Sequence, residues 1–170
     1  TKGEVLYGLA EGRDALAAGA IPVRVEGPMD AIAVTLAGDG HAVGIAPMGT
    51  ALTAAQGELI AAASTTGIVL SALDLDKAGQ AAAVKDYRTY TALGLDAREL
   101  MLVNQVSDEP IKDPADAYRI DPTSLGLALT LPEIAPSMAA QVIRHRLQGD
   151  PHIAEHVGAQ IRAPRDIGAA

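Results

Sequence analysis

The 170-residue sequence contains no cysteine, tryptophan or phenylalanine, and tyrosine occurs only four times. The absence of cysteine excludes disulfide bonds, cysteine-based zinc sites and thiol nucleophiles. With so few aromatic side chains, the core must be built from valine, isoleucine, leucine, alanine and methionine. No uninterrupted apolar run approaches the roughly 18 residues of a membrane-spanning helix, and no signal peptide is visible. We therefore expect a cytoplasmic protein without a membrane partner.

Positive charge is also scarce. Lysine and arginine number 13 against 21 acidic residues, which gives a net charge of -8 and argues against a broad basic surface for nucleic acid. Hydrophobic residues make up 49% of the chain and charged residues 20%, as is typical of a folded globular protein. The length suits one well-buried domain with a small appendage. Because the sequence starts at Thr1 rather than at methionine, we expect a fragment of a longer protein.

Short apolar runs alternate with helical patterns over the first hundred residues. The patterns predict strands at 21–26, 41–45, 67–73 and 98–103, and helices at 8–18, 28–36, 54–63 and 77–92. This order predicts an α/β fold, with a compact parallel sheet of about four strands flanked by helices and joined by right-handed crossovers.

The character of the sequence changes after residue 104. Residues 104–122 are polar, a helical pattern follows over 137–147, and another short helix is expected over 150–163. We predict a catalytic domain over residues 1–122 and a helical C-terminal extension over residues 123–170.

Two acidic motifs stand where predicted strands end. The first is Val-Glu-Gly-Pro-Met-Asp at 25–30, and the second is Leu-Asp-Leu-Asp-Lys-Ala-Gly at 73–79. Ligands gather at the carboxyl ends of strands in open parallel sheets, so these carboxylates are expected to converge. Two like charges about 4 Å apart repel by roughly 4 kcal/mol at an effective dielectric near ~20. A divalent cation relieves that repulsion, and hard carboxylate oxygens suit Mg²⁺ or Mn²⁺.

The two motifs, in this order, resemble the Toprim domain. That domain occurs in bacterial DnaG-type primases, phage primase-helicases, topoisomerases, OLD-family nucleases and RecR-like repair proteins. The resemblance covers roughly residues 4–120 and implies a compact α/β unit with a small, largely parallel sheet. Three further segments resemble the primase branch: Leu6-Tyr7-Gly8-Leu9, Met48-Gly49-Thr50-Ala51-Leu52-Thr53 and Lys112-Asp113-Pro114-Ala115-Asp116-Ala117.

The sequence also departs from the primase pattern. Many bacterial primases place the two acids of the third motif two positions apart, whereas Asp113 and Asp116 are three positions apart, which makes Asp116 a doubtful ligand. The basic subdomain and the zinc-binding module of primases have no counterpart in this sequence.

The resemblance implies roles for particular residues. Glu26 takes the place of a general acid/base or a metal-coordinating carboxylate, and Asp74 and Asp76 are the best metal ligands. Asp30 and Asp113 are further candidates for the metal site. An ordinary interpretation stands beside each role: Asp30, for example, also fits a first-turn acid that the helix dipole stabilises.

Three residues are candidates for contact with substrate phosphates, namely Gly49, Thr50 and Lys77. Gly49 and Thr50 also fit a turn before a helix, and Lys77 also fits a solvated lysine at a helix start.

Taken together, the residues predict metal-dependent nucleotidyl transfer. We expect the catalytic Toprim part of a DNA primase-like protein, which synthesises RNA primers from ribonucleotides on a single-stranded DNA template and has a replicative helicase as a further partner. Two alternatives stay open. A Toprim nuclease would use the same residues with water as the nucleophile, and a non-catalytic module would bind metal or a partner within a replication or mobile-element protein. A topoisomerase is disfavoured because its catalytic tyrosine lies on another domain.

Overall fold

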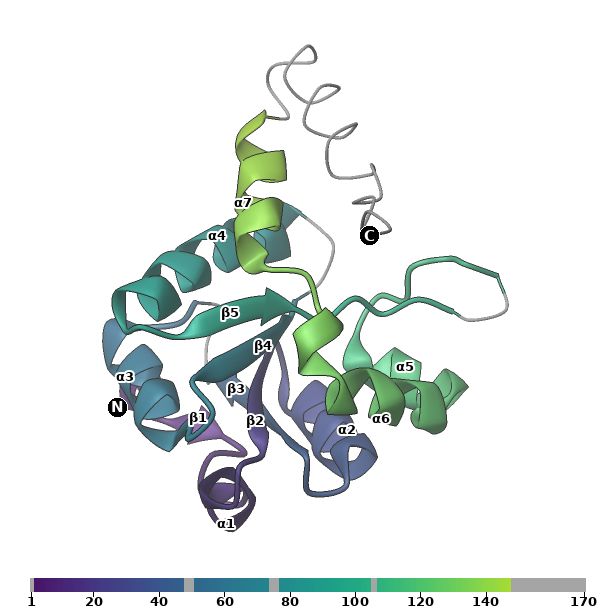
Figure 1. Cartoon of the computed structure of the whole chain (residues 1–170), viewed down its shortest axis with the longest axis horizontal. Coiled ribbons are helices and arrows are strands. Elements are labelled where there is room, and N and C mark those ends of the chain that lie inside the picture. The colour runs from purple at the N-terminus through teal and green to yellow at the C-terminus, as the bar shows by residue number, and fades with distance from the viewer. Residues whose placement is uncertain (1, 48–50, 74–76, 105–106, 148–170) are drawn as a thin grey trace, which may run out of the picture.

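The computed structural model describes residues 2–47, 51–73, 77–104 and 107–147 of the chain. Its centre is a five-stranded sheet with the strand order β1-β3-β2-β4-β5 (Figure 1). The strands are β1 (Leu6–Tyr7), β2 (Ile21–Val25), β3 (Ala42–Pro47), β4 (Ile68–Ala72) and β5 (Asp96–Glu99). Strands β2 to β5 run parallel, whereas β1 is antiparallel to β3. The predicted α/β class is confirmed, with one short antiparallel strand beyond the four that were predicted.

Helices cover both faces of the sheet (Figure 1). The α-helices are α1 (Arg13–Ala17), α2 (Pro28–Gly38), α3 (Ala54–Ala63), α4 (Lys77–Ala92), α5 (Pro114–Ile120), α6 (Pro122–Thr130) and α7 (Met138–Leu147), and the 3₁₀-helices are η1 (Lys2–Glu4) and η2 (Pro132–Ile134). Helices α2, α5 and α6 share one core with strand residues such as Val23 and Val25. Helices α1, α3, α4 and α7 share the other with Val43 and Ile45. Strands β2 and β3 are buried along their whole length, as parallel strands covered on both faces must be.

Glycine allows α2 to lie directly on β3. A Cβ atom at Gly44 would overlap the backbone of Ala31 in α2. Thr35 fixes the same contact, because its hydroxyl accepts the N–H of Gly44 at 3.0 Å and donates to the carbonyl oxygen of Ala31 at 2.9 Å. Helix α6 also approaches α2 closely, since a Cβ atom at Gly126 would lie 2.8 Å from the carbonyl oxygen of Ala37. The β2–α2–β3 unit and α6 therefore form a tightly packed frame behind the first acidic motif.

Four of the predicted helices are confirmed nearly in full. Helix α2 matches the prediction at 28–36. Helices α3 and α4 match the predictions at 54–63 and 77–92, and α7 matches the pattern over 137–147. Thr53 caps α3, because its hydroxyl accepts the N–H of Gln56 at 3.1 Å while the Gln56 side chain accepts the N–H of Thr53 at 3.0 Å. This reciprocal pair is a capping box, which satisfies two otherwise unpaired donors at the start of the helix. The helix predicted at 150–163 lies outside the described residues.

The prediction of a strand at 98–103 is wrong in its bounds. Strand β5 ends at Glu99, because the chain that follows turns back on itself instead of extending the sheet. The N–H of Ile111 donates to the carbonyl oxygen of Leu102 at 2.9 Å, and Val103 forms an antiparallel bridge with Pro110. Leu100 still donates its N–H to the carbonyl oxygen of Ser71 in β4 at 2.8 Å, whereas Leu102 and Val103 pair with residues 110–111.

The prediction of a helix over residues 8–18 is also wrong in its extent. Helix α1 begins only at Arg13. Gly8 has a left-handed φ of 86°, and a Cβ atom there would overlap the backbone of Gly44. The segment before α1 is thus a turn that lies against β3, and it follows the unpredicted strand β1.

Two short helices were not predicted: α5 lies within the polar stretch 104–122, and α6 begins at its last residue. Helices α5 and α6 each begin with proline directly after an aspartate, Asp113 and Asp121, which caps the helix. Helix α6 contributes Leu125 and Leu129 to the core beneath β2. The domain division at residue 122 stays a prediction. In the ranges that the structure describes, no helix is both long and apolar enough to cross a membrane.

Candidate active site

Two of the acidic motifs leave the sheet from neighbouring strands. Strand β2 pairs in parallel with β4, and their last residues, Val25 and Ala72, are partners in the register. Glu26 follows β2 at once and is exposed. The segment between β4 and α4 carries Asp74 and Asp76, which lie outside the described residues. The chain therefore brings the starts of both motifs to one edge of the sheet.

The turn after Glu26 is shaped by the N-terminus of α2. Gly27 is the N-cap in an extended conformation, and Pro28 occupies the first helical position, where its missing N–H costs nothing. The carboxylate of Asp30 reaches back and accepts the N–H of Gly27 at 3.2 Å. An acidic group at this position also lies favourably at the positive end of the helix dipole.

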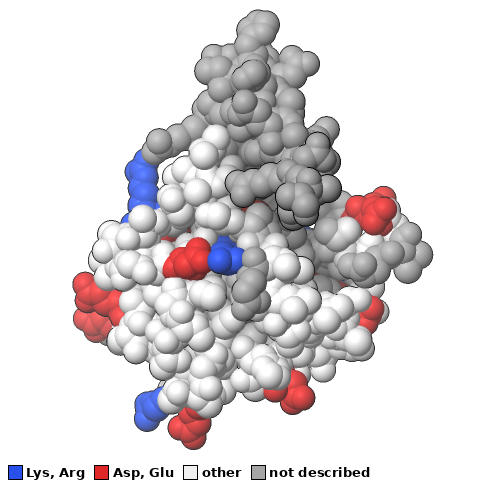
Figure 2. Space-filling model, viewed as in Figure 1, with Lys and Arg blue, Asp and Glu red and all other residues white. Residues whose placement is uncertain are grey.

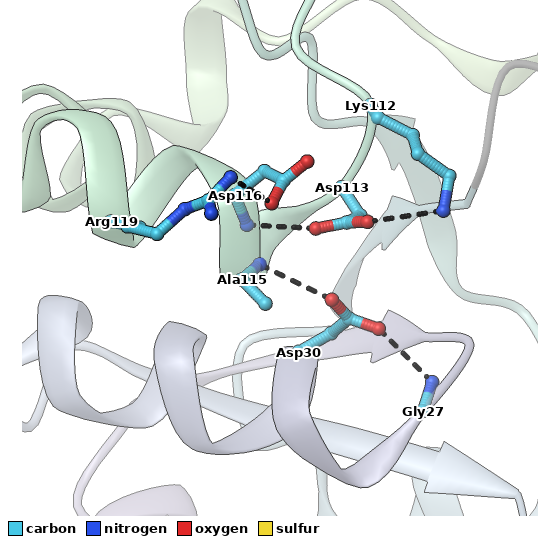
Figure 3. A network of polar contacts seen from close by, with 7 residues as sticks. All are labelled: Gly27, Asp30, Lys112, Asp113, Ala115, Asp116 and Arg119. Atoms are coloured by element: carbon cyan, nitrogen blue, oxygen red, sulfur yellow. Dashed lines mark hydrogen bonds and ion pairs between the residues drawn. The ribbon is translucent and has the colours of Figure 1, made fainter.

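Asp30 also joins α2 to a distant part of the chain. Its second carboxylate oxygen accepts the N–H of Ala115 at 3.2 Å, and Ala115 lies in the first turn of α5 (Figure 3). One side chain thus holds the loop after Glu26 with one oxygen and the start of α5 with the other. The structure shows Asp30 as a clamp between two backbone segments, and its role as a metal ligand stays a prediction.

Asp113 stands at the start of α5, beside the Asp30 clamp. One of its oxygens accepts the N–H of Asp116 at 2.8 Å, and the other lies 3.4 Å from Lys112 Nζ (Figure 3). The Asp113 side chain is 18% exposed, whereas that of Lys112 is 69% exposed. Asp113 therefore caps α5 and also lies next to the exposed ammonium group of Lys112.

Asp116 is engaged elsewhere. Its carboxylate accepts a hydrogen bond from Arg119 Nη2 at 2.9 Å along the outside of α5 (Figure 3). Both side chains are well exposed, at 40% and 77%. The geometry separates Asp113, which faces Lys112 and lies beside Asp30, from Asp116, which pairs along its own helix.

A family model described as Toprim-like matches residues 23–117. The chain belongs to the Toprim-like family. The match runs from β2 through α5, so it contains Glu26, Asp30 and Asp113 as well as the segment with Asp74 and Asp76.

Curated relatives of this Toprim-like chain are named DNA primase. One from Deinococcus radiodurans is 42% identical over 118 residues, which cover 68% of this chain and 19% of the relative. One from Synechococcus elongatus is 42% identical over 82 residues, which cover 48% of this chain and 12% of the relative. The Toprim-like chain thus spans less than a fifth of the length of these relatives.

The fold of the Toprim-like chain matches that of primase catalytic domains. A solved structure of the DnaG primase catalytic domain bound to single-stranded DNA has a TM-score of 0.65 at 27% identity. The match covers 88% of this chain and 44% of that chain. The Toprim-like chain therefore shares its α/β architecture with part of a primase catalytic domain.

The acidic side chains at this edge of the sheet offer the kind of ligand atom that a hard divalent cation binds. The acidic side chains of Glu26, Asp30 and Asp113 offer carboxylate oxygens, which Mg²⁺ and Mn²⁺ prefer. An oxygen that accepts one N–H keeps a second lone pair, so the contacts of Asp30 and Asp113 do not block coordination. Within the described part of the chain, no three acidic or histidine side chains are close enough to hold a metal by themselves. The part of Asp74 and Asp76 in such a metal centre stays a prediction.

The predicted phosphate-contact residues are only partly covered by the structure. Gly49 and Thr50 lie outside the described residues, and Lys77 begins α4. Sequence reasoning missed the backbone N–H of Ala115 as a partner of Asp30, because a main-chain donor leaves no side-chain signal. It also gave no role to Lys112, although its place directly before Asp113 in the third motif was a usable signal.

A small cavity opens beside this edge. It is lined by Ala72 and Leu73 at the end of β4, by Leu100 after β5, and by Ile111, Lys112 and Pro114 before α5. The lining is mostly apolar, with Lys112 as its cationic member and Glu99 as its acidic member. The cavity therefore places an apolar surface with one charge of each sign next to the strand ends.

Proposed function

We propose that this chain is the metal-dependent catalytic Toprim part of a DNA primase-like protein that joins ribonucleotides on a single-stranded DNA template. The observation that carries the proposal is the register of β2 and β4, which starts both acidic motifs at one edge of the sheet. The contact between Asp30 and Ala115 adds the third motif to the same edge. The primase names of the relatives and of the structural neighbour support primer synthesis over the other Toprim chemistries.

In this proposal, Asp74, Asp76 and Glu26 hold Mg²⁺ or Mn²⁺, with Asp113 and Asp30 as further contacts. The bound cation would stabilise negative charge on the reacting phosphate. That help is needed because the chain carries a net charge of -8 and would otherwise repel nucleotides. On the face shown in Figure 2, the few charged side chains are scattered over uncharged surface, one acidic group lies against a basic one, and the basic side chains form no patch.

In this proposal, the residues have different roles in chain extension. The 3′-oxygen of the primer attacks the α-phosphorus of the incoming ribonucleotide, a new P–O bond forms, and the bond to pyrophosphate breaks. Glu26 either takes the proton from the attacking oxygen as a general base or binds a second metal. Asp30 keeps the peptide after Glu26 in place through Gly27. Gly49, Thr50 and Lys77 contact the triphosphate, and the Lys112 ammonium lies at the same edge.

Primer synthesis is tested with the natural full-length protein, labelled single-stranded DNA, ribonucleotides and either Mg²⁺ or Mn²⁺. We expect short ribonucleotide chains that disappear in Glu26→Gln and in Asp74→Asn. The matched control is Asp39→Asn, because Asp39 ends α2 at the opposite edge of the sheet and its left-handed φ of 42° suits asparagine.

The same gel separates the alternative functions. Shortened DNA that disappears in Glu26→Gln and Asp74→Asn would move the assignment to a nuclease, in which water is the nucleophile. Neither product, in a preparation that still binds Mn²⁺, would favour the non-catalytic module. A replicative helicase remains the proposed protein partner, and addition of that helicase to the reaction is expected to increase primer yield.

A further inference from the structure

A buried ion pair lies on the face of the sheet opposite the Asp30 clamp. Arg24 belongs to the central strand β2, and its Nε lies 3.0 Å from the Oδ2 of Asp86 on α4. The two side chains are only 2% and 1% exposed. Arg24 interrupts an otherwise apolar strand whose neighbours in the sequence, Val23 and Val25, face the other core.

The Arg24 guanidinium also holds the end of β2. Its Nη1 donates a hydrogen bond of 2.7 Å to the carbonyl oxygen of Val25. That carbonyl belongs to the peptide bond that leads into Glu26. Arg24 therefore connects the last peptide of β2 to Asp86 in α4, the helix that begins directly after residues 74–76. One side chain thus links the elements that flank the first and second acidic motifs.

The pair is poorly explained by stability alone. Removing two charges from water costs several kcal/mol per ion, and apolar residues of similar volume are often as stable or more stable. Burial raises the pKa of Asp86, and the charge of Arg24 offsets this only in part. Within the described residues, Arg24 Nε and both Asp86 carboxylate oxygens lack a well-formed hydrogen bond. The arrangement is therefore an ion pair with unused hydrogen-bonding capacity in a core that could be apolar.

Tyr90 adds to the polar character of this region. It lies one turn after Asp86 on α4, it is fully buried, and its hydroxyl has no hydrogen-bond partner among the described residues. Burial first, and then the charge of Asp86, raise the pKa of the Tyr90 hydroxyl, so it stays protonated. The hydroxyl therefore does not compete with Asp86 as a negative partner for Arg24.

We propose that Arg24 and Asp86 are positioning residues, whose buried pair fixes the end of β2, and with it Glu26, relative to α4 and the acidic segment before it. The inference rests on the proposed function, because the position of Glu26 relative to α4 matters only if the first and second acidic motifs act on one metal site. A purely structural pair would affect folding alone. A positioning pair affects metal binding even when stability is preserved.

The test measures Mn²⁺ binding to the full chain by titration calorimetry, together with urea unfolding of the same samples. The decisive variant is the double change Arg24→Met with Asp86→Leu, which removes both charges and leaves no unpaired ion in the core. We expect an unchanged or higher unfolding midpoint and a Mn²⁺ affinity about tenfold weaker, as is usual when a residue that orients a ligand is lost. Equal Mn²⁺ affinity in the wild type and the double variant would overturn the inference.

Two further variants separate positioning from stability. Ile60→Val removes one methylene from the same core, on the second half of α3, and is expected to lower stability without changing Mn²⁺ affinity. Arg24→Lys keeps the charge but offers a single nitrogen in place of the Nε and Nη1 atoms that contact Asp86 and the Val25 carbonyl. We expect weaker Mn²⁺ binding in Arg24→Lys, and full affinity there would show that charge alone is sufficient and so contradict positioning.

A local readout completes the design. Hydrogen exchange followed by mass spectrometry is expected to show faster exchange in the peptide that contains Glu26 and Gly27 in the double variant. No Mn²⁺ binding by the wild type, or binding that Glu26→Gln leaves intact, would overturn the proposed metal site itself. Binding that depends on Glu26 but not on Arg24 and Asp86 would overturn only the present inference, so the two failures are distinct.

Discussion

The carboxylate of Asp30 accepts the backbone N–H of Ala115 across 85 positions of the sequence. The same carboxylate accepts the N–H of Gly27, the residue directly after Glu26. The first and third acidic motifs are thus tied together by protein atoms alone. A residue that sequence patterns predict as a metal contact therefore also has a structural task, and the two tasks can be separated by experiment.

The first prediction concerns this clamp. In Asp30→Asn the amide keeps one acceptor oxygen but presents an NH₂ group to the other backbone N–H. One donor is left unpaired, so we expect the free energy of unfolding to fall by about 1–2 kcal/mol in urea titrations. Asp39→Asn, with the same loss of charge at the opposite edge, should change it little. Unchanged stability in Asp30→Asn together with a large loss of Mn²⁺ affinity would instead show a metal ligand without a clamp.

The second prediction compares the two acids of α5. Asparagine caps helices as well as aspartate does, so Asp113→Asn should preserve stability. Because Asp113 lies beside the clamp and Asp116 pairs with Arg119, Asp113→Asn should weaken Mn²⁺ binding by about tenfold, a typical loss for a residue of a metal site. Asp116→Asn should leave it unchanged. Calorimetric titration of both variants with Mn²⁺ checks this. A loss of Mn²⁺ affinity in Asp116→Asn but not in Asp113→Asn would assign the third-motif ligand to Asp116.

The third prediction concerns the contact between α2 and β3. Gly44→Ala places a methyl group where the backbone of Ala31 lies, so α2 must move and the hydrogen bonds of Thr35 must lengthen. We expect a loss of about 3 kcal/mol in the free energy of unfolding. At Gly3 an added Cβ meets only Thr53 Cγ2 at 3.4 Å, so Gly3→Ala is the matched control. Similar stabilities of the two variants would contradict the close packing.

The fourth prediction concerns pH. A hydrogen bond from the Ser124 hydroxyl, then bonds from the backbone N–H groups of Ser124 and Thr123, hold the pKa of Asp121 below its ordinary value. Because the folded-state pKa is the lower one, the stability that Asp121 contributes is present at neutral pH and is lost as the pH falls through that pKa. Ser124→Ala should raise the pKa toward the ordinary value in an NMR titration of the carboxyl carbon. Ser107→Ala should leave it unchanged, and equal pKa values in all three proteins would refute the assignment.

Strong local signals made the sheet and the longer helices predictable. The apolar runs before Glu26 and before Leu73 are long enough to mark strands buried on both faces, and Thr53 with Gln56 marks the start of α3 in the sequence itself. The Toprim motifs then placed the acidic residues at the carboxyl ends of the strands, and the register of β2 and β4 agrees with that placement.

Other features depend on tertiary contacts that short patterns do not contain. Strand β1 has only two residues and exists because Leu6 and Tyr7 pair with the end of β3. Helices α5 and α6 carry a capping aspartate followed by proline, a signal that was present but that the polar composition of residues 104–122 obscured. The partner of Arg24 was not predictable, because Asp86 lies 62 positions later on a helix whose pattern does not show which residue faces β2.

The order in which the chain is made also determines when the acidic edge becomes complete. Strands β2 and β3 and helix α2 are close in sequence, so they can associate while the rest of the chain is still being synthesised. The bond between Asp30 and Ala115 closes a loop of 85 positions and cannot form until the segment before α5 has left the ribosome. The nascent protein can therefore complete its five-stranded sheet before its third acidic motif is docked against α2.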